Sequence, residues 1–355
     1  MAFCILLLAF HVVGIPASQA TDTIKPVPLM AYYYIWFDPQ SWDRAKTDYP
    51  LLGRYSSDDR SVMEQHIQWA KKAGITGFIV SWKSTLVLDS RLQLLIDVAE
   101  KADFKLWIIY QGLDFDRKPL PVERIDSDLD YFTQTYAQSP VFSSYDRPVV
   151  ILSGTWEYSP DEISEITSHH RSQLYILASE HNEAGYLRLA GSVDGNAYYW
   201  SSVDPDTFPN YQGKLDSMAK AVHDHGGLWI APAASGFDAR LIGGTRTVER
   251  KNGQTLLTEL NAAIHSNADA VGLISWNEFS ENSYIEPSQK YGAQSLDTLS
   301  DVEATQPPQI PDFDSSAQGT VDLGRYYSVF VLGIAFVFIL VSIIFVILRR
   351  NRQNR

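Results

Sequence analysis

The chain has 355 residues, enough for one large folded domain, and a formal net charge of −13 at pH 7. An acidic chain does not attract phosphate backbones, so nucleic acid is excluded as the expected partner. The single cysteine, Cys4, lies in the first apolar run, which excludes disulfides, thiolate catalysis and Cys-ligated metals from the rest of the chain. The histidines show no spacing with nearby acids that requires a metal, so we expect neither a metal nor another cofactor.

The first residues have the pattern of a secretory signal. An apolar run from Phe3 to Val13 is followed by a proline and by the small-residue sequence Ala17-Ser18-Gln19-Ala20. This pattern predicts a signal peptide over residues 1–20. The following domain, expected over residues 23–294, would then leave the cytoplasm.

Apolar, β-prone segments alternate with helical segments through that domain. The expected strands are residues 29–36, 76–82, 105–110, 147–153, 174–179, 192–200, 227–232 and 269–276. Helical spacing of apolar residues places helices between most of them, at 63–74, 89–102, 123–138, 160–171, 211–225 and 254–267. Such an alternation indicates a parallel sheet covered by helices, and eight strands in this length predict a (β/α)8 TIM barrel. A doubly wound open sheet is the alternative, but no Gly-rich phosphate loop follows the first strand.

The C-terminal part of the chain has no such alternation. Residues 295–327 are rich in Pro, Asp, Ser and Gly and predict a flexible stalk. Residues 328–348 are apolar and uncharged, long enough for one transmembrane helix, and residues 349–355 contain four Arg. Because basic clusters next to a span stay in the cytoplasm, we expect a single-pass protein of the cell membrane with its barrel on the extracellular or luminal side.

Two acids directly follow the last expected strand. Glu278 and Glu281 lie in "ISWNEFSENSYIEP", residues 274–287, and the catalytic residues of a (β/α)8 barrel lie on the loops after its strands. Glycoside cleavage needs one carboxylic acid to protonate the leaving oxygen and a second carboxylate to act as nucleophile or base. Two Glu three residues apart can reach one pocket, where burial and repulsion would raise one pKa. Glu286, before Pro287, is expected to be structural.

Other residues at strand ends would line the same end of the barrel. Aromatic rings suit the apolar faces of sugars, and amide groups can bond sugar hydroxyls. The residues expected to contact a glycan are Tyr34, Trp36, Trp82, Gln111, Tyr199, Trp276 and Asn277.

Three segments resemble a known family of glycosidases. They are "AYYYIWF" at 31–37, "LGRYSSDDRSVMEQHIQWAKKAGITGFIVSWKS" at 52–84, and the acidic segment at 274–287 with Tyr291-Gly292 after it. Together they resemble glycoside hydrolase family 99, the endo-α-mannosidases, and the related family 71 α-1,3-glucanases. The resemblance extends over residues 30–292 and itself implies a (β/α)8 barrel.

The resemblance also implies a retaining mechanism. Glu278 matches the base that deprotonates the 2-hydroxyl of the sugar, and Glu281 matches the acid/base that protonates the leaving oxygen and later activates water. Tyr199 matches a Tyr that contacts the first acid, and Tyr34, Trp36 and Trp82 match aromatic residues that face the sugar.

The chain departs from the endo-mannosidase pattern at four positions. Phe279-Ser280 stands where that group has Trp-His, Asn282 stands where it has Gly, and Gln111 stands where it has Glu. The expected function is therefore a membrane-anchored, extracellular glycoside hydrolase, retaining and endo-acting on α-linked mannose- or glucose-containing glycans. The alternative function is a non-catalytic glycan-binding barrel in surface polysaccharide assembly or recognition. Catalysis requires the two acids to converge near a Tyr hydroxyl, whereas acids that point apart would favour binding alone.

Overall fold

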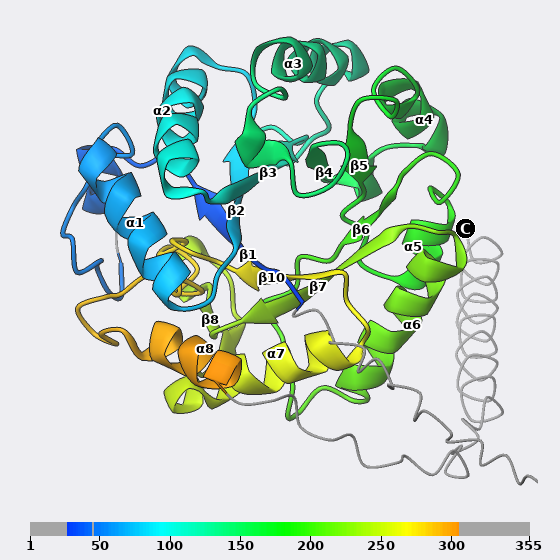
Figure 1. Cartoon of the computed structure of the whole chain (residues 1–355). Coiled ribbons are helices and arrows are strands. Elements are labelled where there is room, and N and C mark those ends of the chain that lie inside the picture. The colour runs from blue at the N-terminus through cyan, green and yellow to red at the C-terminus, as the bar shows by residue number, and fades with distance from the viewer. Residues whose placement is uncertain (1–26, 45, 305–355) are drawn as a thin grey trace, which may run out of the picture. The chain divides into compact units, whose positions relative to one another are not determined.

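Eight parallel strands form a barrel in the computed structural model, which describes residues 27–44 and 46–304 (Figure 1). The strands are β1 (Leu29–Tyr34), β2 (Gly77–Trp82), β3 (Lys105–Gln111), β4 (Val149–Ser153), β5 (Tyr175–Leu177), β6 (Gly195–Ala197), β7 (Leu228–Ala234) and β10 (Ala270–Ile274). Their order is β5-β4-β3-β2-β1-β10-β7-β6. Two backbone bonds of Ala178, at 3.0 Å to Gly195 and 2.8 Å to Ala197, join the ends of this order. The predicted (β/α)8 fold is confirmed.

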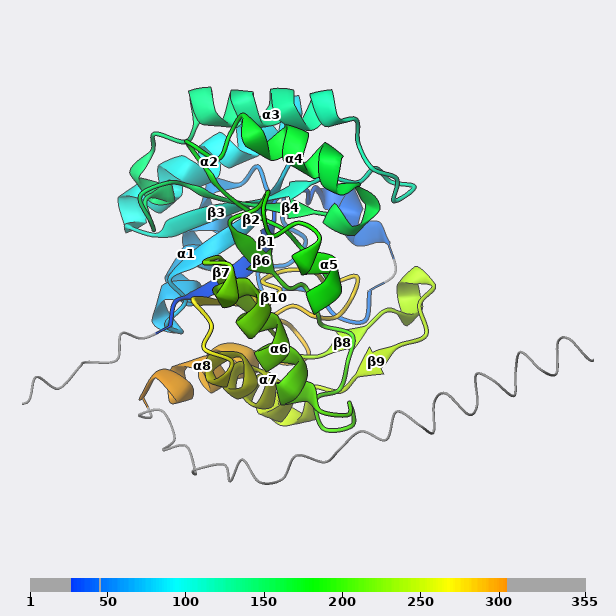
Figure 2. The ribbon, with the colours of Figure 1, turned by 90° about the vertical axis from the view of Figure 1, so that its right-hand side faces the viewer.

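Helices surround the strands (Figure 1). They are α1 (Arg60–Lys72), α2 (Leu86–Ala102), α3 (Val122–Thr135), α4 (Pro160–Ser168), α5 (Glu183–Leu187), α6 (Tyr211–Asp224), α7 (Gln254–His265) and α8 (Gln294–Ala304). Side chains of Asp59, Thr85 and Ser159 cap the first turns of α1, α2 and α4. Figure 2 shows that a hairpin of β8 (Phe237–Asp238) and β9 (Thr247–Val248) lies outside the barrel.

Side chains alternate between the inside of the barrel and the helix layer. On β1, Met30 and Tyr32 pack with the interior cluster, whereas Ala31 and Tyr33 pack with the cluster beneath the helices. The period of two that governs a strand therefore decides which residues can reach the open end of the barrel.

Helix α8 corrects the expected end of the domain. Residues 294–304 are helical, and Leu296 and Leu299 are buried, 6% and 1% exposed. In the sequence these leucines lie among Gln, Ser, Asp and Thr, a composition that is typical of a polar tail. The barrel domain therefore includes residues 295–304, where a flexible stalk was expected.

The terminal predictions fall on other parts of the chain. The signal peptide at 1–20, the remainder of the stalk at 305–327, the transmembrane helix at 328–348 and the basic tail at 349–355 lie outside the described residues. Within residues 27–44 and 46–304, no helix has the length and apolarity needed to cross a bilayer.

Gly195, where β6 meets β7, has no room for a side chain. Its φ is +153°, and an added Cβ would lie 2.2 Å from the carbonyl oxygen of Leu228. We expect Gly195→Ala to lower the free energy of unfolding by about 1–3 kcal/mol, because the backbone must shift or take a strained conformation. Thermal melting measures this, with Gly191→Ala as the control, since nothing lies within 4 Å of a Cβ there. Equal melting temperatures for the two variants would contradict the expectation.

Candidate active site

Glu278 and Glu281 lie on the loop after β10, at the carboxyl end of the barrel strands. The loop is fixed locally: the backbone N–H of Glu278 donates to Ser275 Oγ at 2.8 Å, and the N–H of Ser280 donates to Glu278 Oε1 at 2.9 Å. The side chain of Glu278 is buried, with the residue 8% exposed, while Glu281 is half-buried. The carbonyl of Glu281 accepts a bond from Asp238 N at 2.7 Å, which ties the loop to β8.

Burial raises the pKa of both acids, and the charge of Glu281 adds to the rise at Glu278. Burial, and then the charge of Glu281, raises the pKa of Glu278 to about 7, although bonds from Ser280 and the charge of Lys46 oppose the rise. Burial also raises the pKa of Glu281, and the charge of Arg117 opposes it. Two carboxyl groups that share a partly dry site therefore hold protons at higher pH than exposed carboxyl groups do.

Two tyrosine hydroxyls lie beside the acids. The hydroxyl oxygens of Tyr34, at the end of β1, and Tyr199, two residues after β6, are 2.8 Å apart. Burial is the largest cause that raises the pKa of each Tyr well above 10, and the charges of both Glu278 and Glu281 add to it. The two acids and the two hydroxyls therefore lie near enough to one another to interact electrostatically at the same end of the barrel.

Two other predicted contact residues lie at this end of the barrel. Trp36 is 41% exposed and stacks on Tyr34 with ring centroids 4.3 Å apart, so its other face is open to a sugar ring. Gln111, at the end of β3, is half-buried and donates from Nε2 to Ser81 Oγ at 3.0 Å.

Trp82 and Trp276 do not lie in the site, and the expectation for both is corrected. Each is 0% exposed and packs beneath the helices. Trp82 donates to Asp89 Oδ1 at 2.9 Å, and Trp276 packs on Phe78 and His66 at 5.2 and 5.4 Å between centroids. A position near a strand end did not reveal which face the side chain takes.

Asn277 is likewise too buried to touch a glycan. It is 0% exposed, and its side-chain amide bonds the backbone of Tyr34 on both sides: Tyr34 N donates to Oδ1 and Nδ2 donates to Tyr34 O, each at 2.9 Å. Asn277 therefore holds β1 against the loop that carries Glu278 and Glu281, and its expected role as a substrate contact is corrected.

The departures in the acidic loop have structural explanations. Phe279 is 1% exposed, stacked on Tyr284 with centroids 3.9 Å apart and edge-on to Trp42 at 5.5 Å, so its ring serves packing. Asn282 has a φ of 54° in the left-handed region, where Gly is most favourable and Asn is the next common choice. The backbone of the loop is therefore compatible with Gly or Asn at this position.

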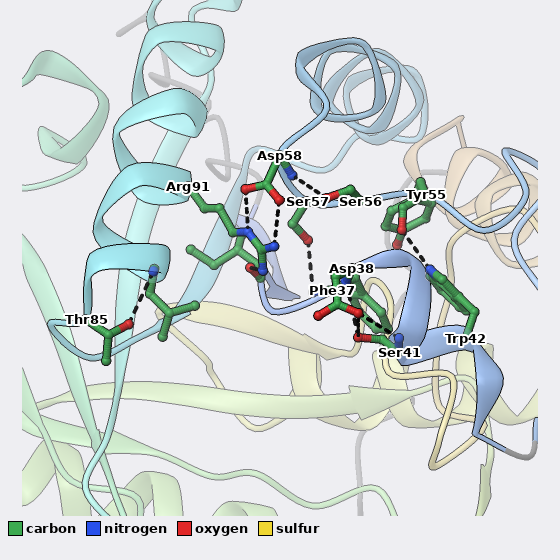
Figure 3. Close-up of polar contacts among 12 residues, drawn as sticks. Phe37, Asp38, Ser41, Trp42, Tyr55, Ser56, Ser57, Asp58, Thr85 and Arg91 are labelled. Atoms are coloured by element: carbon green, nitrogen blue, oxygen red, sulfur yellow. Dashed lines mark hydrogen bonds and ion pairs between the residues drawn. The ribbon is translucent and has the colours of Figure 1, made fainter.

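The loop between β1 and α1 is held by a buried arginine (Figure 3). Arg91 of α2 donates from Nε and one terminal nitrogen to the two oxygens of Asp58, at 2.8 and 2.7 Å, and from the other to the carbonyl of Ile35 at 3.1 Å. Trp42 donates to the carbonyl of Tyr55 at 2.7 Å within the same loop. These contacts support the segment that carries Trp36.

Two cations near the acids were missed in the sequence. Lys46 Nζ donates to Ser280 Oγ at 3.2 Å and lies close enough to Glu278 to affect its pKa, while Arg117 affects Glu281. Both come from loops far from the acids in the chain, so only a pairing signal across long sequence separation could have found them.

Lys46 offers a test of the electrostatics. We expect Lys46→Met to raise the pKa of Glu278 above about 7, by about half a unit, because a nearby positive charge that favours the ionised carboxylate is removed. Difference titration against Glu278→Gln measures the shift. Lys118→Met, which removes an exposed charge, is the control. A Glu278 pKa that is unchanged or lower in Lys46→Met would show that Lys46 does not act on this carboxylate.

No group of three or more His, Cys, Asp or Glu side chains that could hold a metal occurs within residues 27–44 and 46–304. The fold and site therefore define a (β/α)8 barrel with a pair of carboxyl groups after its last strand, an arrangement that glycosidases use.

Comparison with known proteins gives the family. The model of "Glycosyl hydrolase family 99" matches residues 36–302. This match covers most of the chain, and the protein belongs to that family.

Individual relatives are distant. The chain is 24% identical over 272 residues to a glycoprotein endo-alpha-1,2-mannosidase-like protein of Danio rerio, covering 69% of this chain and 60% of that protein. It is 21% identical over 269 residues to a glycoprotein endo-alpha-1,2-mannosidase of Rattus norvegicus, covering 69% and 57%. The chain thus spans less than two thirds of the length of these relatives.

A solved structure has the same fold. The GH99 endo-alpha-mannosidase of Bacteroides thetaiotaomicron superposes with a TM-score of 0.70 at 22% identity, covering 79% of this chain and 97% of that one. A glycoside hydrolase-like protein superposes with a TM-score of 0.58 at 16% identity, covering 78% and 93%.

Proposed function

We propose that the protein is a retaining, endo-acting glycoside hydrolase, which cleaves α-linked mannose-containing glycans at internal bonds of the glycan. The observation that carries the proposal is the convergence of Glu278 and Glu281 with the bonded hydroxyls of Tyr34 and Tyr199. An exposed ring at Trp36 adds a surface for a sugar beside them. The charge of Glu281 acts on Glu278, which supports acids that share one site over the acids pointing apart that a non-catalytic glycan-binding barrel would allow.

The two acids would divide the reaction between them. The carboxylate of Glu278 takes the proton from the sugar's 2-hydroxyl, and O2 attacks the anomeric carbon while Glu281 protonates the departing oxygen. Glu281 then takes a proton from water, which attacks the anomeric carbon, and Glu278 returns its proton to O2. Two displacements at one carbon retain its configuration. A carboxylate whose conjugate acid has a pKa of about 7 is a stronger base than an ordinary carboxylate, which suits the first step.

The sugar and the cellular location belong to the same proposal. The similarity to proteins named as endo-mannosidases supports mannose, rather than glucose, as the sugar at the bond that this protein cleaves. The apolar segment 328–348 and the Arg residues after it favour a barrel anchored to the cell membrane and facing outward.

The test is a panel of glycans incubated with the full chain. α-Mannans and N-glycans with α-linked mannose should release oligosaccharides, and α-1,3-glucans should release less. Product stereochemistry, followed by NMR from the first turnover, should show retention. Product released equally by wild type and by a variant with Gln at both 278 and 281 would refute the assignment. Binding without product would favour the non-catalytic barrel.

A further inference from the structure

Four buried polar side chains form a hydrogen-bonded network beneath the loop that carries Glu278 and Glu281. His66 of α1 contacts Glu286 through Nε2 and Oε1 at 2.9 Å, and the hydroxyl of Tyr55 donates to the other oxygen, Oε2, at 2.9 Å. The hydroxyl of Tyr33 lies 3.0 Å from Nδ1 of His66. His66, Glu286, Tyr33 and Tyr55 are 0%, 2%, 2% and 6% exposed, so water does not compete for these bonds.

The hydrogen bonds in this network have a consistent direction. A carboxylate only accepts, and both oxygens of Glu286 are engaged. His66 therefore donates from Nε2 to Glu286, and in the tautomer that leaves Nδ1 without a proton the ring accepts from the Tyr33 hydroxyl. Burial, and then the charge of Glu286, raises the pKa of both Tyr33 and Tyr55 well above 10, so both hydroxyls keep the protons they donate.

At Tyr55, the network reaches the residues of the proposed catalytic site. Asn277 Nδ2 donates to the hydroxyl oxygen of Tyr55 at 3.2 Å and to the carbonyl of Tyr34 at 2.9 Å. Asn277 also accepts from the backbone N–H of Tyr34 and directly precedes Glu278. One amide thus fixes the backbone beside two groups of the site, and Glu286 with Tyr55 fixes that amide.

We propose that Glu286 and His66 are positioning residues of the proposed hydrolase, which set Tyr34 and Glu278 relative to each other through Tyr55 and Asn277. The inference rests on the proposed function but assigns new roles, since neither residue touches the substrate. It has a physical basis in the steep dependence of reaction rate on the placement of catalytic groups. Supporting residues behind a reactive site commonly change activity by about 10- to 100-fold.

The test uses Glu286→Gln and His66→Gln in the full chain. Glu286→Gln keeps the shape of the side chain and His66→Gln keeps a polar group at its end, but each weakens the bonds to its partners. We expect kcat to fall about 10- to 100-fold and KM to change less than about threefold. Because both residues act through one network, kcat of the double variant should fall by about as much as kcat of either single variant. Losses that multiply in the double variant would overturn the proposal.

Glu259→Gln is the matched control. Glu259 is a buried carboxyl group of α7, 1% exposed, that accepts a bond from Ala234 N at 2.7 Å. It does not belong to the network of His66, Glu286, Tyr33 and Tyr55. It should keep wild-type kcat. A similar fall in kcat for Glu259→Gln, with similar losses of melting temperature, would show a general effect of disturbing the core and would overturn the proposal.

A difference titration separates this inference from the proposed function. The carboxyl of Glu278 is faced by Glu281, Lys46, Tyr34 and Tyr199, so its pKa reports the local geometry. We expect that pKa to move by about half a unit or more in Glu286→Gln and His66→Gln, but not in Glu259→Gln. If wild type cleaves no glycan, the proposed function fails and this titration still decides the positioning role. An unchanged pKa together with unchanged kcat would refute it.

Discussion

Replacing Glu278 or Glu281 with Gln is expected to lower kcat on an α-mannan by about 10³-fold or more, because each amide can neither accept nor donate the proton that its step requires. Glu278→Gln removes the base for the 2-hydroxyl, and no activated leaving group restores it. Glu281→Gln removes the proton donor, so a substrate with a good leaving group, such as a dinitrophenyl glycoside, should recover part of the rate. The two variants therefore differ in how they respond to the leaving group.

Steady-state kinetics on both substrates measures this difference. Glu157→Gln, an exposed position on the loop after β4, is the control and should match wild type. Melting temperature and circular dichroism must show that each variant is folded. If the activated substrate restored the rate of Glu278→Gln and not that of Glu281→Gln, Glu278 would be the proton donor and Glu281 the base.

Glu278→Gln is also expected to raise stability at neutral and alkaline pH. The folded protein holds the pKa of Glu278 at about 7, above the usual 4.5, so between these values the folded state binds more protons than the unfolded state. The contribution of this group to stability is therefore favourable at low pH and is lost as pH rises from 4.5 to about 7. At pH 8 the wild type bears the full cost of a buried carboxylate, roughly 3 kcal/mol at most, and Gln removes it.

Thermal or denaturant unfolding at two pH values tests this expectation. Glu278→Gln should be more stable than wild type at pH 8, and the difference should shrink towards pH 4.5. A stability difference that does not depend on pH, or that grows as pH falls, would contradict the raised pKa. A variant that is inactive but more stable would fit a site that is strained for its function.

The sequence by itself predicted the architecture. Runs such as Thr76 to Trp82 and Asp269 to Trp276 are mostly apolar because strands of a parallel barrel are buried on both faces. Strand position also located Glu278 and Glu281, since parallel strands place their following loops at one end of a barrel. Local chemistry along the chain was sufficient for both predictions.

Only the tertiary structure decided which side chains share the site. Trp82 and Trp276 are aromatic and lie at or just after strand ends, yet both pack beneath the helices: the alternation along β2 turns Trp82 there, and Trp276 packs there from two residues beyond β10. Lys46 reaches Ser280 across 234 positions, and Glu286 meets His66 across 220. Contacts of this kind depend on packing between elements, which no local pattern encodes, so sequence identified the acids and the fold determined what surrounds them.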